Sequence, residues 1–442
     1  MVSPPPALAT AGALRLELRH HVSNGAEGYA LARLRAEPRW AGPEQPASTP
    51  DWGDYRLSVF EAGTSTLVHR SGFDSSLDVH AASAATCLSV RMPAPRGAII
   101  ATIEKRRAGA VFTQAWRMEI DPAAADIDRS APALATRVHA IAANGDPRGK
   151  VDIALLGDGY TAAEESKFVA DAKRAAGYLF SVEPLRARSG DFNVHAVFTA
   201  SAESGVTDPY LGIEKNTVFG CAYGAGAAER TLAPADGHAV REAASTVAYD
   251  FVLILANARR YGGSAHFGGP ATVAIDSAAA RYLVVHEFAH VIGGLADEYY
   301  LPTGSGPSYN GTREPWNPNV TVAAAHAKWT MPDSRPASWN KAAYDTAFAG
   351  YVRRYFALRA AQAPEVAVEQ LMQRAKQRQA ALLSAYRGQR TVGLYEGGNG
   401  YARGVFRSEA DCIMFSLQTD YFCSACAAAI NRMIDIQCGR VR

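Results

Sequence analysis

The stretch Leu283-Val-Val-His-Glu-Phe-Ala-His-Val-Ile292 is the starting point for predicting the fold. Its apolar residues indicate a helix buried in a core, and its two histidines are four positions apart. Residues at that spacing lie on one face of a helix, so both imidazoles can reach one ion. Glu287 can lean over the same ion without binding it, take a proton from water and pass it to a leaving amine. The stretch therefore predicts a zinc site with ligands His286 and His290 and with Glu287 as general base.

A catalytic zinc site needs a third protein ligand, with its fourth position open. Gly293 and Gly294 follow the second histidine and can end the helix with a positive φ. The carboxylates Asp297 and Glu298 then stand where a returning chain would meet the ion. They could instead simply begin a polar loop. The need for a third ligand favours ligation by one of them.

Upstream of this helix, strands and helices alternate. Val151-Asp-Ile-Ala-Leu-Leu156 and Asp250-Phe-Val-Leu-Ile-Leu255 are typical of buried strands, and Thr161 with Glu164 forms a capping box for a helix that ends near Phe180. This alternation predicts a mixed, mostly parallel sheet. The short run Ala271-Thr-Val-Ala-Ile275, flanked by glycines and a proline, predicts an edge strand.

The first part of the chain has a different pattern of apolar and polar residues. Residues 13–120 contain short alternating runs separated by turn residues, which predict an N-terminal antiparallel β-sandwich. Residues 1–12, rich in Pro and Ala, are expected to be a flexible arm, and residues 121–136 a linker. The domain with the zinc site then spans 137–442, with a helical hairpin at 342–387 as an insertion. The expected fold class is α+β or α/β.

The composition is that of a globular protein. The 442 residues are 48% hydrophobic and 20% charged, and 45 Lys and Arg balance 43 Asp and Glu to a net charge of +2. Such a balance gives no reason to expect nucleic acid or an anionic membrane as a partner. No stretch approaches the roughly 18 apolar residues of a transmembrane helix.

The cysteines bear on the location of the protein. Four of the six lie close together in the C-terminal sequence, at Cys412, Cys423, Cys426 and Cys438. Such a group indicates either a pair of disulfides or a structural zinc site. Only one CxxC pair is present, so disulfides are favoured. The N-terminus lacks the features of a signal peptide, which leaves a cytosolic protein or one whose signal precedes this sequence. Disulfides favour a secreted, periplasmic or cell-surface location.

The longer stretch His286-Glu-Phe-Ala-His-Val-Ile-Gly-Gly-Leu-Ala-Asp-Glu-Tyr299 resembles the signature of the IgA-peptidase family of bacterial zinc metallopeptidases, which is placed among the metzincins. The likeness covers most of residues 140–435 and is weaker over the front domain. Other segments resemble the family in the same order, among them Asn144-Gly-Asp-Pro147, Asp191-Phe-Asn-Val194, Arg260-Tyr-Gly-Gly263, Pro315-Trp-Asn-Pro-Asn-Val-Thr321 and Asp411-Cys-Ile-Met414.

This resemblance implies a metzincin-like core, with an edge strand above the cleft and a methionine turn below the zinc. Met414, tied down by Cys412, is the candidate for that turn. A substrate would pair antiparallel with the expected edge strand, whose residues are Ala271, Thr272, Val273, Ala274 and Ile275.

The resemblance also selects between the two carboxylates. The metzincin pattern puts a third histidine three residues after a glycine, a position that is Ala296 counted from Gly293 and Asp297 counted from Gly294. One inserted residue and an exchange of His for Asp would reconcile this sequence with the pattern. Asp297 would then bind zinc, and Glu298 would hydrogen-bond a ligand histidine. Ser416 stands where some metzincins have a tyrosine, so the oxyanion donor stays open among Tyr299, Tyr300 and Tyr401.

Together these patterns predict a secreted zinc-dependent endopeptidase with one Zn²⁺ per chain, acting on protein or peptide substrates. The family's name suggests immunoglobulin as one of them. The alternatives are a zinc amidase that acts on cell-wall or small amide substrates, and an inactive binding protein with a structural zinc. Glu287 argues against the inactive protein, because a structural site has no use for a base.

Overall fold

The computed structural model describes residues 8–23, 26–43, 50–75, 85–107, 110–225, 228–300, 308–309, 311, 313–332, 335–387 and 390–441. The chain divides into two compact units. The first comprises Met1–Ser181, Leu185–Ile292 and Arg432–Arg442, and the second comprises Val182–Pro184 and Gly293–Asn431. The domain boundary expected at residues 121–136 stays a prediction.

The N-terminal part of the first unit consists of two four-stranded sheets. One has the order β5-β1-β2-β8, with β1 (Leu8–Ser23), β2 (Ala26–Glu37), β5 (Ala85–Pro95) and β8 (Ile127–Asp128). The other has the order β4-β3-β6-β7, with β3 (Tyr55–Glu61), β4 (Leu67–Phe73), β6 (Ile99–Arg106) and β7 (Phe112–Ile120). Strand pairs are antiparallel except β2 with β8, which are parallel.

A single hydrophobic core joins these two sheets into a sandwich. Leu14, Leu16 and Leu18 of β1 and Leu57 and Val59 of β3 belong to the same buried cluster. Their period of two sends alternate side chains inward, which confirms the predicted N-terminal sheet domain. Strand β1 already begins at residue 8, inside the stretch 1–12 expected as an arm. The rest of that stretch, residues 1–7, lies outside the described residues.

The rest of the first unit is built on a six-stranded sheet of order β15-β16-β14-β10-β11-β9. Four strands are parallel, and an antiparallel strand lies at each edge. The strands are β9 (Arg137–Ala142), β10 (Val151–Asp158), β11 (Phe192–Phe198), β14 (Phe251–Ala256), β15 (Gly263–Ser264) and β16 (Ala271–Ala274). The prediction that 271–275 form the edge strand is wrong, because β15 pairs with β16 and takes the edge. A strand of two residues carries no periodicity from which it could be predicted.

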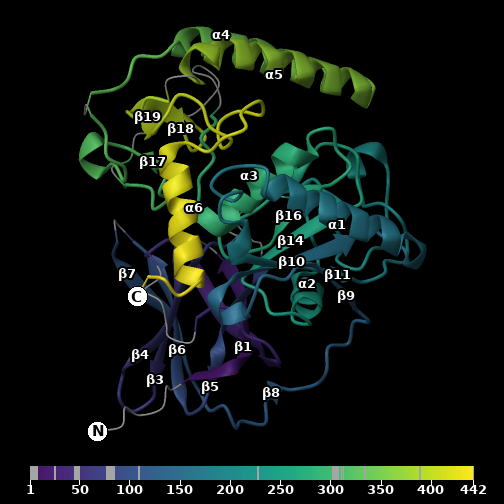
Figure 1. Ribbon diagram of the computed structural model, residues 1–442, viewed down its shortest axis with the longest axis vertical. Coiled ribbons are helices and arrows are strands. Elements are labelled where there is room, and N and C mark those ends of the chain that lie inside the picture. Colours follow the sequence, from purple (N-terminus) through teal and green to yellow (C-terminus); the bar gives the residue numbers. More distant parts are fainter. Residues whose placement is uncertain are drawn as a thin grey trace. The chain divides into compact units, whose positions relative to one another are not determined.

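Helices cover both faces of this sheet (Figure 1). On one face, Phe168 of α1 (Glu165–Leu179) packs against β10 at Gly157, and Phe288 of α3 (Ala280–Gly293) packs against Phe251 of β14. On the other face, Val240 of α2 (Gly237–Ala244) shares a core with β10 and β14. The capping box of Thr161 and Glu164 is present ahead of α1, as the sequence predicts. A short ribbon of β12 (Ala222–Tyr223) and β13 (Leu232–Ala233) completes the unit.

The second unit contains a small antiparallel sheet and a long helical hairpin. The sheet has the order β17-β19-β18, with β17 (Val320–Thr321), β18 (Tyr395–Gly398) and β19 (Tyr401–Arg407). The hairpin consists of α4 (Lys341–Ala360) and α5 (Glu365–Arg387), where the sequence predicts it. Helix α6 (Ser424–Gln437) begins in this unit. The guanidinium of Arg407 is fully buried here and donates to the carbonyl oxygens of Gly397 and Ala410 at 2.7 and 3.1 Å.

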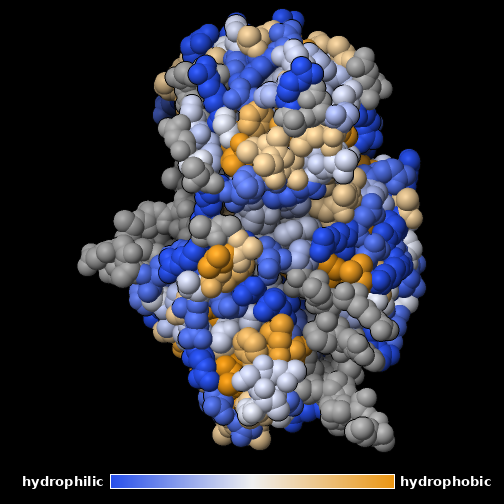
Figure 2. Space-filling view, turned by 90° about the vertical axis from the view of Figure 1, so that its left-hand side faces the viewer, coloured by the Kyte–Doolittle hydropathy of each residue, from blue (hydrophilic) through white to orange (hydrophobic). Residues whose placement is uncertain are grey.

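The surface is chemically mixed. On the face drawn in Figure 2, hydrophobic residues form separate patches with hydrophilic residues around them. Among the described residues, no helix combines the length and the apolar character that a membrane crossing requires.

The carboxyl groups of Asp152 and Asp250 lie near each other where strands β10 and β14 begin. The carboxylate of Asp250, just before β14, accepts a hydrogen bond from the backbone N–H of Asp152 at 2.8 Å. Asp152 is fully buried, and burial raises the pKa of its carboxyl to about 6, although Asn193 donates to it at 3.0 Å. Burial and the neighbouring Asp152 raise the pKa of Asp250 as well. A raised carboxyl pKa means that the folded state binds a proton more tightly than the unfolded state.

Asp152→Asn is expected to stabilise the fold at pH 8 by about 1–3 kcal/mol, since a shift of one pKa unit corresponds to about 1.4 kcal/mol. The contribution of Asp152 to the stability of the parent chain is fully present below the unfolded pKa near 4 and is lost as the pH rises through about 6. The advantage of the variant should therefore disappear by pH 4. Denaturant unfolding at pH 4, 6 and 8 tests this, with the exposed Asp126→Asn as the control. An advantage that is equal at pH 4 and pH 8 would contradict the assignment.

Candidate metal centre

The two histidines of α3 face each other across one turn of the helix. The Nε2 atoms of His286 and His290 are 3.2 Å apart, and the ring planes are almost perpendicular, at 88°. Two nitrogens bound to one tetrahedral zinc at about 2.0–2.1 Å are about 3.3 Å apart. His286 is 3% exposed, and His290 is partly exposed. The pair thus has the separation that a shared zinc ion requires and is reachable from solvent.

Tyr282 lies one turn before His286 on the same helix. Its hydroxyl is 2.9 Å from Nδ1 of His286, and the two rings are stacked. A histidine that offers Nε2 to a metal keeps its proton on Nδ1, so the tyrosine oxygen can accept that proton's hydrogen bond and orient the ring. The sequence analysis missed this residue. The signal was the repeated spacing of four from Tyr282 through His286 to His290, which puts all three on one helix face.

Asp297 completes a group of three candidate ligands. One ligand atom each from His286, His290 and Asp297 can be chosen so that all three lie within 4.8 Å of one another. The group comes from one short continuous stretch of chain, in which α3 ends at Gly293 and Gly294 takes a φ of +58°. That positive φ is the helix ending expected from the glycine pair. Two imidazole nitrogens and one carboxylate oxygen are a donor set that suits catalytic zinc.

The segment after the turn is held by hydrogen bonds to two asparagines and one backbone amide. The side chain of Asn319 bonds both the N–H and the C=O of Ala296, each at 2.9 Å, and Asn317 donates to the carbonyl of Gly294 at 2.9 Å. The backbone N–H of Asn399 donates to the carbonyl of Asp297 at 2.7 Å. These bonds fix the backbone that carries Asp297. The asparagines stand in the run 315–321, which resembles the family, but no role for them followed from the sequence.

Glu298 points elsewhere than predicted. Its Oε1 atom accepts from Asn319 at 3.1 Å and lies 3.3 Å from Sγ of Cys423 and 3.2 Å from Sγ of Cys426. The side chain is fully buried, and burial raises the pKa of its carboxyl well above the usual range. The expectation that Glu298 supports a ligand histidine is therefore corrected: its carboxylate belongs to a group of cysteines.

The cysteines also differ from the prediction. All six are thiols, so the expected disulfides are not supported. The Sγ atoms of Cys412 and Cys426 are 3.8 Å apart, whereas a disulfide bond is about 2.05 Å long. Cys438 lies away from this pair, with its Sγ 4.0 Å from the carbonyl oxygen of Asp191. Cys438 is close to the other three cysteines in the sequence. In the structure, helix α6 holds it apart from them.

Glu287 lies beside the edge strand β15. A Cβ placed on Gly263 would come 2.9 Å from Oε1 of Glu287 and 3.1 Å from its Cγ. Gly263 thus leaves the room that the carboxylate occupies. Glu287 itself is 8% exposed on α3. The strand predicted to bind substrate is less accessible: Ala271, Thr272, Val273, Ala274 and Ile275 are all at most 1% exposed. The antiparallel pairing expected for a substrate is made instead by β15, at Gly263 and Ser264.

Met414 and the three tyrosines considered as oxyanion donors are the remaining residues predicted for the site. Met414 is fully buried, and its carbonyl oxygen accepts from the backbone N–H of Glu298 at 2.8 Å, so this turn is bonded to the neighbour of Asp297. Of the three tyrosines left open as oxyanion donors, Tyr300 is buried and donates its hydroxyl proton to Asp345 at 2.9 Å. Tyr299 is 43% exposed, and Tyr401 packs edge-on against Tyr309.

Two models of known protein families match the sequence. Residues 139–434 match the family model described as IgA Peptidase M64, and residues 7–117 match the one described as Peptidase M64 N-terminus. The first match spans more than half of the chain and includes every candidate ligand. Among curated proteins, no match was found. The two matches confirm the resemblance seen in the sequence.

Asp297→Ala is expected to abolish tight zinc binding at the histidine pair, because the site loses one of three ligands. Tyr282→Phe should weaken zinc affinity by about 10–100-fold, the usual effect of removing a group that orients a ligand. Competition titration with a chromophoric chelator measures both, and Tyr29→Phe on β2 is the control for the same chemical change. If Asp297→Ala binds zinc at the pair as tightly as the parent chain, Asp297 is not a ligand.

Proposed function

The chain belongs to the IgA peptidase M64 family, and from this premise we propose that it is a zinc-dependent endopeptidase that cleaves peptide bonds in protein substrates. The observation that carries the proposal is the group of His286, His290 and Asp297 with Glu287 on the same helix. The family supports a peptidase, and the donor set suits a metal that activates water.

Each side chain of the site has a separate role in the proposed hydrolysis. His286, His290 and Asp297 would hold the ion, and Tyr282 orients the ring of His286. A zinc ion supplies Lewis acidity there, since it polarises a carbonyl oxygen and lowers the pKa of water to about 7. Glu287 accepts the proton of the attacking water on its carboxylate and delivers it to the leaving amine. Low exposure of Glu287 limits competition from bulk water.

Gly263 positions that carboxylate by lacking a side chain. Its Cα lies next to Oε1 of Glu287, and it belongs to β15 at the edge of the six-stranded sheet. Edge strands bind extended peptides through backbone groups that are free. The N–H of Gly263 already donates to the carbonyl oxygen of Arg230 at 3.3 Å, so we assign peptide alignment to the region around β15, in place of the buried residues 271–275, and not to that N–H.

Three finer features belong to the same proposal. A metzincin-like arrangement is supported by the bond between Glu298 and the Met414 carbonyl, which ties the methionine turn to the third ligand's segment. Immunoglobulin as a substrate rests on the family's description alone. A secreted or cell-surface location stays a prediction from the sequence. An amidase acting on small or cell-wall amides is the competing outcome of the tests below.

Glu287→Gln is expected to keep the metal and the fold but lose at least about 100-fold in the rate of peptide hydrolysis, the lower end expected for a general base. Glutamine has nearly the same shape and cannot accept the proton. Peptide profiling of digests of casein, immunoglobulin A and cell-wall peptides measures activity and substrate class together. The control is Glu369→Gln on the exposed face of α5. Hydrolysis of proteins at the parent rate would refute the role of Glu287, and cleavage of only small amides would indicate an amidase.

Gly263→Ala should lower the rate by about 10–100-fold, because misplacing a catalytic group by about 1 Å can cost that much. The added methyl group meets Oε1 and Cγ of Glu287 at 2.9 and 3.1 Å and the backbone carbonyl oxygen of Thr272 at 3.1 Å, so the carboxylate must move and β16 must yield slightly. The fold and the metal content are therefore measured alongside the rate. Gly177→Ala on α1 is the matched control, since a Cβ there meets nothing within 4 Å. Unchanged kcat with full metal content in Gly263→Ala would show that Glu287 is not positioned in this way.

A further inference from the structure

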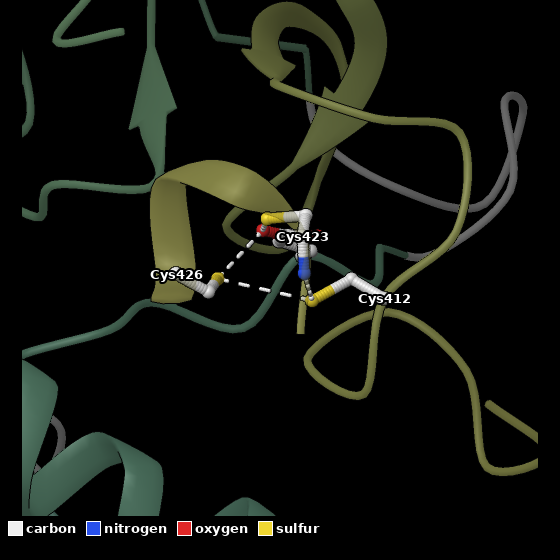
Figure 3. A group of neighbouring side chains, drawn as sticks. Cys412, Cys423 and Cys426 are labelled. Atoms are coloured by element: carbon white, nitrogen blue, oxygen red, sulfur yellow. Dashed lines mark hydrogen bonds between the residues drawn. The ribbon is translucent and has the colours of Figure 1, made fainter. Parts of the chain in front are cut away.

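A second group of potential metal ligands lies in the second unit. It consists of Glu298, Cys412, Cys423 and Cys426, and one ligand atom from each lies within 4.8 Å of all the others. Figure 3 shows the three sulfur atoms converging on a common space. Cys412 comes from the loop before Met414, Cys423 from the residue before α6, and Cys426 from the first turn of that helix. All four residues are fully buried.

The distances within the group fit one tetrahedral ion. Two thiolates bound to zinc at about 2.3 Å are about 3.8 Å apart, and a thiolate and a carboxylate oxygen are about 3.5 Å apart. The Cys412 and Cys426 sulfurs are 3.8 Å apart, and Glu298 Oε1 lies 3.3 and 3.2 Å from the sulfurs of Cys423 and Cys426. The sulfur separation exceeds the length of a disulfide by almost a factor of two.

Glu298 gives an independent sign that a further partner belongs in this group. Its second oxygen, Oε2, is buried and has no hydrogen-bond partner among the described residues. An ionised carboxylate that is buried without a partner costs several kcal/mol or more. Asn319 donates to the other oxygen only, so Oε2 is left open to a further partner, which a bound cation would supply.

Backbone N–H groups are directed at the sulfur of Cys412. Its Sγ accepts from the backbone N–H of Cys423 at 3.2 Å and lies 3.5 Å from the backbone nitrogen of Met414. Backbone N–H groups directed at sulfur stabilise the negative charge of a metal ligand. A disulfide could join only two of the three cysteines and would leave a thiol and a carboxylate buried together.

We propose that Glu298, Cys412, Cys423 and Cys426 bind a second zinc ion, which is structural. Four protein ligands leave no open position for water or substrate, as in structural zinc sites. Its ligands join the segment beside Asp297 to the loop that carries Met414 and to the start of α6. This inference does not depend on the proposed peptidase activity.

Metal analysis of the full chain, purified without chelator, tests the proposal. The parent chain should contain two zinc ions, and the double variant His286→Ala/His290→Ala should retain one. After exchange with cobalt, this double variant should show thiolate-to-cobalt charge-transfer absorption, which a site of histidines and carboxylate cannot give. Because the double variant leaves the cysteines untouched, the test does not require the cysteine variants to fold.

Substitutions in the group identify the ligands. Cys426→Ser should remove the charge-transfer band and one metal ion, and Glu298→Gln should weaken binding of that ion. Cys438→Ser and Cys87→Ser, which alter cysteines outside the group, should keep both ions and the band. The proposal would be overturned if the parent chain held only one zinc ion and the histidine double variant held none and showed no charge-transfer band. Mass spectrometry that finds a disulfide among Cys412, Cys423 and Cys426 in the purified chain would also overturn it.

Discussion

Two adjacent carboxylates, Asp297 and Glu298, serve different groups of ligands, and the arrangement of both groups depends on the backbone between them. Consecutive side chains of a non-helical chain leave the backbone in different directions. Asp297 lies within ligand distance of His286 and His290, and Glu298 lies against the cysteines. The carbonyl of the first residue and the N–H of the second are bonded to Asn399 and Met414. A change in direction of this short segment would therefore disturb both groups together.

The cost of burying so many polar groups explains why this segment is so extensively bonded. The asparagine side chain at 319 satisfies both backbone groups of Ala296 and one oxygen of Glu298. Buried polar groups without partners are expensive, so networks of this kind specify one conformation when they are complete. Within the described residues the network lacks one partner, at Glu298 Oε2. A cation among the cysteines would complete it.

The sequence predicts those parts of the structure that depend on local periodicity. The spacing of four between His286 and His290 places the pair on one helix face, Gly294 ends that helix with a positive φ, and alternation over 13–120 predicts the paired sheets. The parts that it could not predict depend on contacts between distant segments. Strand β15 has two residues and exists because β16 pairs with it. The cysteine partners of Glu298 lie more than a hundred residues further along the chain.

Cys438 shows the converse limit of prediction from sequence, because residues that are close in the sequence lie apart in the structure. It stands close to Cys426 in sequence, and counting cysteines makes it a member of the group. Helix α6 runs from Ser424 to Gln437, and at about 1.5 Å per residue it carries Cys438 roughly 18 Å from Cys426. The fourth place in the group is taken by a carboxylate that no spacing rule would select.

The chemical difference between the two groups fits the two roles proposed for zinc in this chain. Two neutral imidazoles and one carboxylate leave a zinc ion with residual positive charge and an open position, which are the properties that polarise a carbonyl. Three thiolates and a carboxylate supply more negative charge than the ion carries and fill its four positions. Such an ion has little Lewis acidity and serves to hold segments together. Glu298 is buried and Asp297 is partly exposed. This difference fits the two proposed roles, because a catalytic ion must be accessible to substrate and a structural ion need not be.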